Sequence, residues 1–590
     1  MKSTDCITLQ VIAERLNTIV GEMTVTLTRT ARSPIANETR DFSVAIFDAR
    51  GRLVAQSLGC PILMGAMKWS VEGILKDFRH DLHDGDMILN NDPYCGGAHM
   101  GDMTLAMPIF YKNRLVLFPA ARSHQVDAGG GGVKPGGFNP EARNCFEESL
   151  RIPPLRICER GQMKWDIYDW VIRNSRFKEW FQGDIDAMIA SCRIAERRIH
   201  QLLDEFGPET VVEALEYALD YSERRVRSEI EGWPDGTYEA SSYLDGDGYY
   251  NFDIHFHATV TIQGSDLKVD FNGSSPQVRG FANSPLGNTW SWTFIALCGV
   301  LDPEIPKNEG IFRPVSLIAP EGSVVNPREG AATGFCTIHP GAEIAEVVTL
   351  ALSKAIPNRV GTMWDKKVEP VISGIDPRTG KPYLSLNFVM MNGGDGAAFC
   401  HDGWGGLCIT RGGMAYTTVE MSEVQYPHFI EEREFIQDSC GPGRWRGGPG
   451  VKTVERMIDH EASAALMVWG GKYPSSGLCG GKHGSPNRCI LQRETGDVEV
   501  PPGRCLESQV IPGDRICIFK GGGGGWGDPY SRPPDLVAAD VSDGYTSIQA
   551  AERDYGVVLD PRDLSVDEKK TVQLRESRQA DGNGPKGGSS

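Results

Sequence analysis

Glycine is concentrated in the last third of the chain and limits what that part can fold into. Beyond residue 380 the sequence includes "MNGGDGAAFCHDGWGG", "GPGRWRGGPG", "WGGKYPSSGLCGGKHG" and "FKGGGGGWGDPYSRPP". The chain has 69 glycines among 590 residues, which exceeds the usual share of about 7% by more than half. Glycine permits backbone conformations that other residues avoid, and the irregular spacing excludes a solenoid repeat. We therefore expect short strands, tight turns and close backbone contacts.

The run GGGGGWG at 521–527 allows two interpretations. Its backbone N–H groups could cradle an anion, or the run could be a flexible packing loop. A P-loop is excluded because no GxxxxGK[ST] sequence occurs in the chain. The pattern favours the packing loop and leaves the anion site open.

Hydrophobic periodicity divides the chain into helices and strands. Apolar residues at helical spacing predict an amphipathic helix over 5–23. Alternating patterns predict a hairpin over 40–56, strands at 85–94 and 114–127, and a strand pair at 251–262 and 267–271 joined by QGSD. A break at 206–210 splits 184–231 into a helical hairpin, and further helices are expected over 340–356 and 545–555.

The length exceeds what one hydrophobic core usually serves. We predict an α+β chain of several subdomains, with mixed β-sheets, a central helical hairpin and a glycine-rich C-terminal β region. The expected segments are an N-terminal α/β region with the metal site (1–165), the helical hairpin (166–235), a β-rich segment (236–330), a glycine-rich α/β region (331–535), a C-terminal helical extension (536–575) and a disordered tail (576–590).

Charge and cysteine content exclude several classes of function. A net charge of -18 and a pI near 5.2 argue against binding of nucleic acid or of an anionic membrane surface. No apolar run approaches the ~18 residues of a membrane helix, and MKSTDCITLQVIAERL lacks the pattern of a secretory signal, so we expect a cytoplasmic protein. The 15 cysteines include no CxxC, which argues against a zinc finger or ribbon and favours buried thiols.

Two segments carry residues suited to a metal site. "NNDPYCGGAHMGDMTL" (90–105) places His99 and Asp102 three residues apart, and "RSHQVDAGGGG" (122–132) adds His124 and Asp127 at the end of a strand. One backbone turn would let His99 and Asp102 converge, and Asp41 could complete a shell of nitrogen and oxygen ligands. Such a shell suits Zn²⁺, Mn²⁺ or Fe²⁺ better than Ca²⁺ or Mg²⁺. A helix cap or a plain glycine-rich loop would explain the spacing equally well.

Two other groups of residues are weaker candidates for metal binding or for acid–base catalysis. His255 and His257 share one face of a predicted strand, where a half-buried surface pair is favoured over a metal site. "GGDGAAFCHDGWGG" contains Asp395, His401 and Asp402, which could act as acid or base or simply lie in a solvated turn. The chain has no GxSxG nucleophile elbow.

Several longer stretches point to a known family. They are "RDFSVAIFD", "NDPYCGGAHMGDMTL", "ARSHQVDAGG", "FNPEARNCFEESLRIPPLRI", "PEGSVVNP", "DSCGPGRWRGGPGV" and "GGGGGWGDPYSR". In this order, from about residue 5 to about residue 560, they resemble the hydantoinase B family. That family comprises the B-type subunits of ATP-dependent hydantoinases, 5-oxoprolinases and caprolactamase, and subunits of acetone and acetophenone carboxylases are related to it.

The resemblance implies two kinds of subunit. A larger hydantoinase A-type partner would bind ATP and Mg²⁺ and activate the substrate or bicarbonate by phosphorylation, in an α2β2 or larger assembly. This chain would hold a divalent metal, Zn²⁺ or Mn²⁺, through His99, Asp102 and His124, with Asp41 as fourth ligand. Many members read Thr-His-Leu-Pro-Asp and His-His-Ala-Asp where this chain has AHMGD (98–102) and HQVD (124–127), so the ligands match and the pocket wall differs.

The function that the resemblance implies is a subunit of an ATP-dependent cyclic-amide amidohydrolase, acting on a lactam, hydantoin or oxoproline-type small molecule. The metal would polarise an oxygen or activate water, with Asp127 or His401 as base. The alternative is a subunit of an ATP-dependent ketone carboxylase that uses bicarbonate. A non-catalytic scaffold and a metal-binding protein without a partner are further hypotheses, and the intact ligand set argues against the scaffold.

Overall fold

The structure of the chain is a computed structural model that describes residues 4–57, 59–78, 81–131, 139–387, 392–406 and 415–580. The chain divides into two compact units. Unit 1 comprises Met1–Ser242, Tyr249–Ala351 and Arg411–Tyr416, and unit 2 comprises Tyr243–Gly248, Leu352–Thr410 and Thr417–Ser590. Helices and several β-sheets occur together, which confirms the predicted α+β class.

The first sheet of unit 1 has eight strands, all paired antiparallel. Its order is β2-β1-β6-β4-β3-β7-β8, and β5 pairs with β6. The strands are β1 (Phe42–Asp48), β2 (Leu53–Gln56), β3 (Met87–Asn90), β4 (Asp102–Ala106), β5 (Ile109–Tyr111), β6 (Arg114–His124), β7 (Leu155–Glu159) and β8 (Gln162–Met163). The predicted hairpin and the two predicted strands that follow it are confirmed as β1–β2, β3 and β6.

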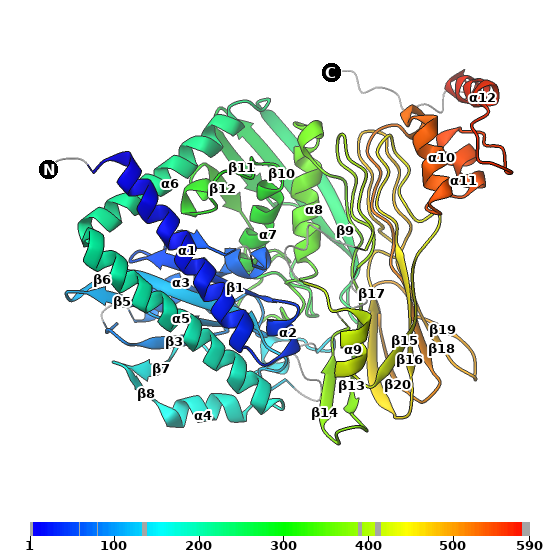
Figure 1. Cartoon of the computed structure of the whole chain (residues 1–590). Coiled ribbons are helices and arrows are strands. Elements are labelled where there is room, and N and C mark those ends of the chain that lie inside the picture. Colours follow the sequence, from blue (N-terminus) through cyan, green and yellow to red (C-terminus); the bar gives the residue numbers. More distant parts are fainter. Residues whose placement is uncertain are drawn as a thin grey trace. The chain divides into compact units, whose positions relative to one another are not determined.

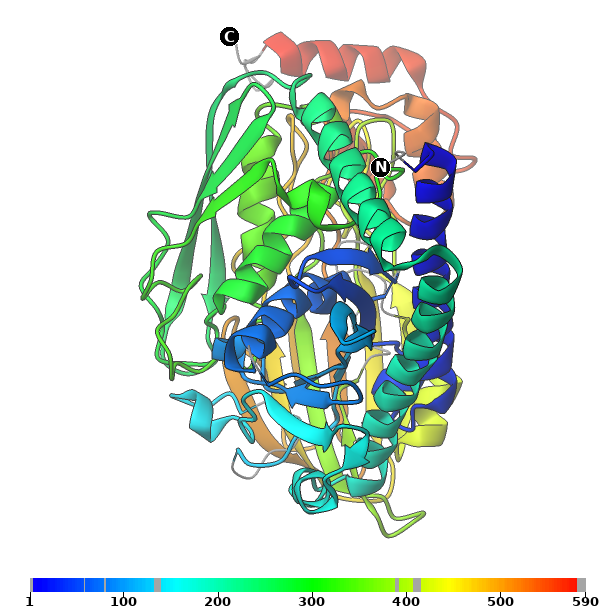
Figure 2. The same ribbon diagram turned by 90° about the vertical axis from the view of Figure 1, so that its left-hand side faces the viewer.

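Helices cover both faces of this sheet (Figure 2). α1 (Cys6–Thr30) and α5 (Lys178–Phe206) pack against each other and on the apolar face, where Val44, Met103 and Leu105 enter a large core. α3 (Pro61–Asp77) packs against β1, β4 and β6 on the opposite face. α6 (Pro208–Ile230) follows α5 after Gly207 and also packs on α1, which confirms the two predicted successive helices. The shorter helices are α2 (Pro34–Asn37) and α4 (Trp165–Arg173).

The second sheet has the order β12-β11-β10-β9. Its strands are β9 (Gly236–Gly246), β10 (Phe252–Gln263), β11 (Asp266–Asp270) and β12 (Val315–Ile318), and the residues of β9 from Tyr243 onward belong to unit 2. Buried and more exposed residues alternate along β10, and Gly264, with a φ of 58°, turns the chain into β11 as predicted. α7 (Leu286–Cys298) packs against α3, and α8 (Gly341–Leu352) confirms the predicted helix near 340–356.

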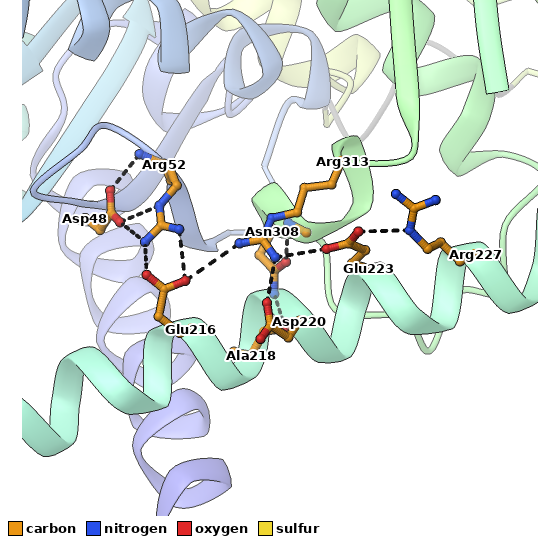
Figure 3. A network of polar contacts seen from close by, with 10 residues as sticks. Asp48, Arg52, Glu216, Ala218, Asp220, Glu223, Arg227, Asn308 and Arg313 are labelled. Carbon is orange, nitrogen blue, oxygen red and sulfur yellow. Dashed lines mark hydrogen bonds and ion pairs between the residues drawn. The ribbon is translucent and has the colours of Figure 1, made fainter. Parts of the chain in front are cut away.

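Figure 3 shows a charged network that fastens α6 to the β1–β2 hairpin and to the segment around residues 308–313. Arg52, between β1 and β2, pairs with Asp48 at 2.6 Å and with Glu216 of α6 at 2.5 Å. The further contacts are those of Arg313 with Asp220 and Glu223, and of Glu309 with the Leu53 backbone and Lys68. Because Lys68 belongs to α3, the network holds the hairpin, α6 and α3 in one arrangement.

Unit 2 contains two sheets that share one hydrophobic core. Their orders are β14-β13-β17-β20 and β15-β16-β21-β18-β19, and side chains of both, including Val368, Leu466 and Ile516, pack together. The strands are β13 (Val368–Ile375), β14 (Pro382–Ser385), β15 (His428–Phe435), β16 (Val451–Met457), β17 (Ala462–Val468), β18 (Arg488–Gln492), β19 (Val498–Glu499), β20 (Cys505–Val510) and β21 (Arg515–Phe519). The helices are α9 (Val419–Gln425), α10 (Pro534–Ser542), α11 (Ile548–Tyr555) and α12 (Glu568–Ala580).

The glycine-rich segments of unit 2 lie side by side as extended chains and form a buried bundle (Figure 1). Their backbones touch, because a Cβ added at Gly523 would lie 1.8 Å from the Asp395 carbonyl oxygen. Residues 521–525 are buried, and each of their N–H groups donates to another segment, as Gly523 does to the Gly448 carbonyl at 3.0 Å. The run is therefore a packed core element instead of a flexible loop. Since its N–H groups have protein acceptors, the anion-cradle interpretation is excluded.

The C-terminal end differs from the sequence prediction. α12 extends to Ala580, beyond residue 575 where the helical extension was predicted to end, so 576–580 are helical; residues 581–590 lie outside the described residues. The break between units after Ala351 falls inside the predicted segment 331–535, and the division into six segments stays a prediction. Among the described helices, none has the length and apolar character needed to cross a membrane.

The bundle makes a prediction about stability. Gly523→Ala should lower the unfolding free energy of unit 2 by several kcal/mol, as severe overpacking of a core does. The added methyl group would meet closely packed backbone atoms. Gly361→Ala is the matched control, since a Cβ there finds its nearest listed neighbour, the Ala397 carbonyl oxygen, at an ordinary 3.8 Å. Chemical denaturation of both variants measures the difference. Equal unfolding free energies would contradict a close-packed bundle.

Candidate metal centre

Three of the predicted ligands meet at one point in unit 1. His99 Nε2 lies 3.0 Å from Asp102 Oδ1 and 3.1 Å from His124 Nδ1, and His124 Nδ1 lies 3.2 Å from Asp102 Oδ1. The two imidazole rings stack with their centroids 4.9 Å apart, and all three side chains are buried. Within the described ranges, this is the group of His, Cys, Asp and Glu residues whose atoms could hold one metal ion.

The register of three strands places this group at one end of the first sheet. His124, the last residue of β6, pairs with Asp102, the first residue of β4, and the His124 N–H donates to the Asp41 carbonyl beside β1 at 3.0 Å. Paired residues of neighbouring strands point to the same face, so Asp41, His124 and Asp102 form a row. His99 reaches the row from the turn before β4, whose backbone closes from Asp102 N–H to the His99 carbonyl at 3.1 Å. Asp102 begins a strand, so the helix-cap interpretation is wrong.

Gly101 leaves the space in which the two imidazole rings meet. A Cβ at this position would lie 2.7 Å from His99 Cε1 and 2.8 Å from His124 Cε1. A side chain here would therefore displace at least one ring. Of the three departures from the Thr-His-Leu-Pro-Asp pattern, the one at Gly101 thus lies next to both histidines.

The three atoms are spaced as the ligands of one cation are. With bonds of about 2.0–2.2 Å, neighbouring ligand atoms lie about 3.0 Å apart in an octahedral shell and about 3.4 Å apart in a tetrahedral one. The distances here are 3.0 to 3.2 Å. Two buried atoms of the group, His99 Nδ1 and Asp102 Oδ2, have no hydrogen-bond partner, which is unusual for buried polar atoms. Two imidazole nitrogens with a carboxylate oxygen fit Zn²⁺ or Mn²⁺ better than Ca²⁺.

The two carboxyl groups of the row have different electrostatics. Burial raises the pKa of Asp102, but the adjacent His99 and His124 outweigh burial and hold that pKa below its ordinary value. Burial raises the pKa of Asp41, and the negative charge of Asp102 raises it further against the opposing effect of the histidines. A cation beside both carboxylates would relieve their repulsion. The structure places Asp41 next to the three converging residues, and its role as fourth ligand stays a prediction.

Asp127 is bound to an arginine. Its Oδ1 accepts from Arg176 Nη2 at 2.6 Å and from the Gly129 N–H at 3.2 Å, and its Oδ2 accepts from the Arg176 backbone N–H at 2.6 Å and from Nε at 3.0 Å. These contacts fasten the segment after β6 to the segment before α5. They favour a structural role, and its assignment as a general base stays an untested prediction.

His401 lies in unit 2 and is exposed. Its Nδ1 is 2.9 Å from the Asp402 carbonyl oxygen, and it lines an open cavity of about 450 Å³ with Trp404 and Phe435. The Asp402 carboxylate accepts two hydrogen bonds of 2.8 Å from the buried Arg532, so this carboxylate is structural. The catalytic role of His401 stays a prediction.

His255 and His257 agree with the surface-pair interpretation. Both are half-buried on β10. His255 Nδ1 lies 3.1 Å from the Gly273 carbonyl oxygen, and His257 Nδ1 lies 3.1 Å from the Ser241 hydroxyl. One nitrogen of each ring is thus hydrogen-bonded within the protein.

Comparison with known proteins decides the family. The family model described as hydantoinase B/oxoprolinase matches residues 5–529. This chain belongs to that family. The caprolactamase subunit beta of Pseudomonas jessenii is 32% identical over 573 residues, covering 95% of this chain and 97% of that one. The 5-oxoprolinase of Dictyostelium discoideum is 26% identical over 538 residues, which cover 90% of this chain and 41% of that longer one.

Solved structures agree with this membership. The crystal structure of an ATP-dependent caprolactamase from Pseudomonas jessenii matches with a TM-score of 0.91 at 32% identity, over 98% of this chain and 100% of that one. A nucleotide-free acetone carboxylase structure matches with a TM-score of 0.89 at 20% identity, over 98% of this chain and 84% of that one. At that identity the second likeness shows a common fold alone.

Three buried residues beside the metal group of this hydantoinase B family member were not singled out from the sequence. Cys60 lies near Asp41, and Cys336 bonds through Sγ to the Ala98 carbonyl at 3.3 Å; burial raises the pKa of both thiols well above its ordinary value. Arg122 lies two residues before His124 on β6 and so shares its face. Strand alternation could have identified Arg122, whereas no spacing marks the two cysteines.

A second buried polar cluster lies in unit 2. Ser422 Oγ is 2.8 Å from His428 Nε2, and His428 Nδ1 pairs with Glu455. The order resembles a nucleophile, a base and an orienting carboxylate, but Ser422 and His428 are only 2% and 4% exposed. Nucleophilic catalysis needs a serine that a substrate can reach. The cluster is therefore a structural polar core.

The structural role of Asp127 can be tested by a double-mutant cycle. Asp127→Asn and Arg176→Gln should each lower the unfolding free energy by about 1–3 kcal/mol, because each leaves a charged partner without its counterpart. The double variant should cost clearly less than the sum of the two. Denaturant titration measures all four proteins, and additive losses would mean that the ion pair does not stabilise the fold.

The raised pKa of Glu148 should make the stability of unit 1 depend on pH. Burial raises the pKa of Glu148 to about 8, although hydrogen bonds from the Thr333 and Gly334 N–H groups lower it. The folded protein therefore keeps a proton that the unfolded chain loses near pH 4.5, and the unfolding free energy should fall as pH rises from about 4.5 to about 8, by up to ~1.4 kcal/mol per pH unit. Glu148→Gln should remove this slope in denaturation measured across pH. Identical slopes in both proteins would contradict the raised pKa.

Proposed function

We propose that this chain is the metal-bearing subunit of an ATP-dependent amidohydrolase that opens cyclic amides of the lactam, hydantoin or oxoproline type. The observation that carries the proposal is the convergence of His99 Nε2, Asp102 Oδ1 and His124 Nδ1 within 3.2 Å of one another. Family membership and the likeness to a caprolactamase subunit support the substrate class.

The residues of the centre would each have a defined part. Neutral His99 and His124 would offer ring nitrogens, and Asp102, whose pKa is held low, would offer a charged oxygen at physiological pH. Asp41 would be the fourth ligand, because it follows His124 in the same row and its charge is otherwise opposed by Asp102. When bound, a divalent cation such as Zn²⁺ or Mn²⁺ would polarise the substrate oxygen or lower the pKa of a water molecule.

We propose that ATP and Mg²⁺ bind to a separate hydantoinase A-type subunit. The sequence has no P-loop, and the matched region fills only 41% of the Dictyostelium 5-oxoprolinase, so most of that longer chain lies outside the part shared with this one. The relative named as a beta subunit supports a complex of at least two kinds of chain. An α2β2 or larger assembly in which the partner phosphorylates the substrate is our proposal for the working enzyme.

A ketone carboxylase is the second candidate. The acetone carboxylase structure shares the fold over 98% of this chain, and a carboxylase could use the same metal centre on a substrate activated with bicarbonate. A pure scaffold subunit is disfavoured, because burying two histidines and an aspartate with unpaired atoms costs stability that a scaffold has no reason to bear.

Metal analysis tests the centre directly. The wild type, co-purified with its partner, should carry about one Zn or Mn per chain, and His99→Ala and His124→Ala should each lose it, because each removes one of about three protein ligands. His257→Ala is the matched control, a histidine of unit 1 whose ring contacts Ser241 and Thr259. A metal-free wild type, or a metal content equal in all four proteins, would refute the assignment.

Product analysis separates the two reactions. The loaded complex should hydrolyse a lactam or hydantoin only when ATP is present, and no label from ¹⁴C-bicarbonate should enter the product. Label in the product formed from a ketone would establish the carboxylase instead. Hydrolysis that is equally fast without ATP would contradict both candidates.

A further inference from the structure

A buried arginine lies beside the metal centre, on the strand that carries His124. Arg122 is fully buried, and its guanidinium makes four hydrogen bonds. The acceptors are Thr104 Oγ1 at 2.7 Å, the Leu63 carbonyl at 3.1 Å, Ser70 Oγ at 2.6 Å and the Gly96 carbonyl at 3.0 Å. All four acceptors are neutral hydroxyl or carbonyl oxygens. Among the described residues, Arg122 has no carboxylate as a direct partner.

A buried arginine without an ion pair lowers the stability of the fold, so its presence here needs an explanation. Burying a guanidinium without an ion pair costs free energy that a leucine or methionine of similar volume would avoid. What those side chains lack is a fork of donors that can reach several backbone segments at once. The contacts therefore point to positioning.

Two of the four contacts reach the segments that carry the other two converging ligands, and the contacts with Leu63 and Ser70 reach α3. Thr104 is on β4, two residues after Asp102, and its hydroxyl lies opposite Arg122 in the register of β4 and β6. The Gly96 carbonyl lies three residues before His99, and Ser70 Oγ of α3 donates to the same carbonyl at 2.8 Å. Arg122, Ser70 and Gly96 thus form a closed triangle of hydrogen bonds.

The segment before His99 is pressed onto α3 at that triangle. Gly96 has a φ of 93°, and a Cβ there would lie 2.1 Å from the Trp69 carbonyl carbon. A Cβ at Gly73, one turn further along α3, would lie 2.6 Å from the Cys95 carbonyl oxygen. Because two glycines make this approach possible, small displacements of the segment are blocked on the α3 side, and Arg122 restrains it from the sheet side.

We propose that Arg122 is a positioning residue that holds the segment 96–101 and the start of β4 in place, so that His99 meets Asp102 and His124. One side chain on the third ligand's strand thereby sets the distance between the other two. This inference rests on the proposed function, because it assumes that His99, Asp102 and His124 bind a metal ion.

Two substitutions and a control test this. Arg122→Lys keeps the charge but loses the fork, and Arg122→Met removes charge and donors. Arg156→Lys is the matched control, because Arg156 is a largely buried arginine of the same sheet that pairs with Asp81 and Asp86. Amide hydrogen exchange of residues 96–102 is measured on metal-free protein, and metal release to a chelator is measured on loaded protein, both well below the unfolding temperature.

The proposal expects both Arg122 variants to lose protection across 96–102 and to release metal about 10- to 100-fold faster, while Arg156→Lys matches the wild type in both. Exchange in the Arg122 variants equal to that of the control would overturn it, and so would unchanged metal release. A wild type that takes up no metal would refute the proposed function, whereas the exchange result would still decide whether Arg122 holds the segment. If Arg122→Met fails to fold, Ser70→Ala removes two of the three hydrogen bonds of the triangle and gives the same readout.

Discussion

The pairing of β6 with β1 on one side and with β4 on the other is the constraint on which unit 1 depends. A slip of β6 by one residue would turn His124 to the opposite face of the sheet, under α1 and α5, and a slip of β4 would do the same to Asp102. That face is filled by apolar side chains such as Val44, Met103 and Leu105. Burial of these side chains therefore decides the register, and the register in turn decides that the polar row faces α3. The candidate metal centre is thus positioned by the hydrophobic core on the other face of the sheet.

On the sheet face that carries the row of Asp41, His124 and Asp102, the following rows become progressively less polar. The second row is Ser43, Arg122 and Thr104, and the third consists of Ala45, Ala120 and Ala106. Three alanines leave room for α3 to approach the sheet, while the second row supplies the donors and hydroxyls that bind it. Glu309, next to the charged network of Figure 3, also holds α3 through its ion pair with Lys68. α3 is thus held in three ways: by close packing on the alanine row, by hydrogen bonds to the polar row, and by the ion pair of Lys68 with Glu309.

Much of this fold follows from the sequence, and the parts that do not have physical reasons. Period-two and period-3.6 patterns were enough for β1, β2, β6, β10 and α5, because each has one buried face. The last turns of α1 were missed because TVTLTRT alternates like a strand, yet the hydroxyls of the threonines satisfy carbonyls four residues earlier. His99, Asp102 and His124 were predictable from residue type and family pattern. The partner of Asp127 was not, because Arg176 is 49 residues away in the chain and only the folded topology joins them.

The glycine bundle has a consequence for the order in which this chain can fold during synthesis. Segment 521–525 supplies hydrogen bonds and backbone surface to strands of the bundle that come from around 363, 395, 440 and 482, so these strands lack a central neighbour until residue 525 has left the ribosome. Most of unit 1 lies before residue 352 in the chain and has been made long before then. A chain that ends before residue 520 would therefore contain the residues of the candidate metal centre but an incomplete glycine bundle. Completion of unit 2 therefore depends on one of the last segments of the chain to be made.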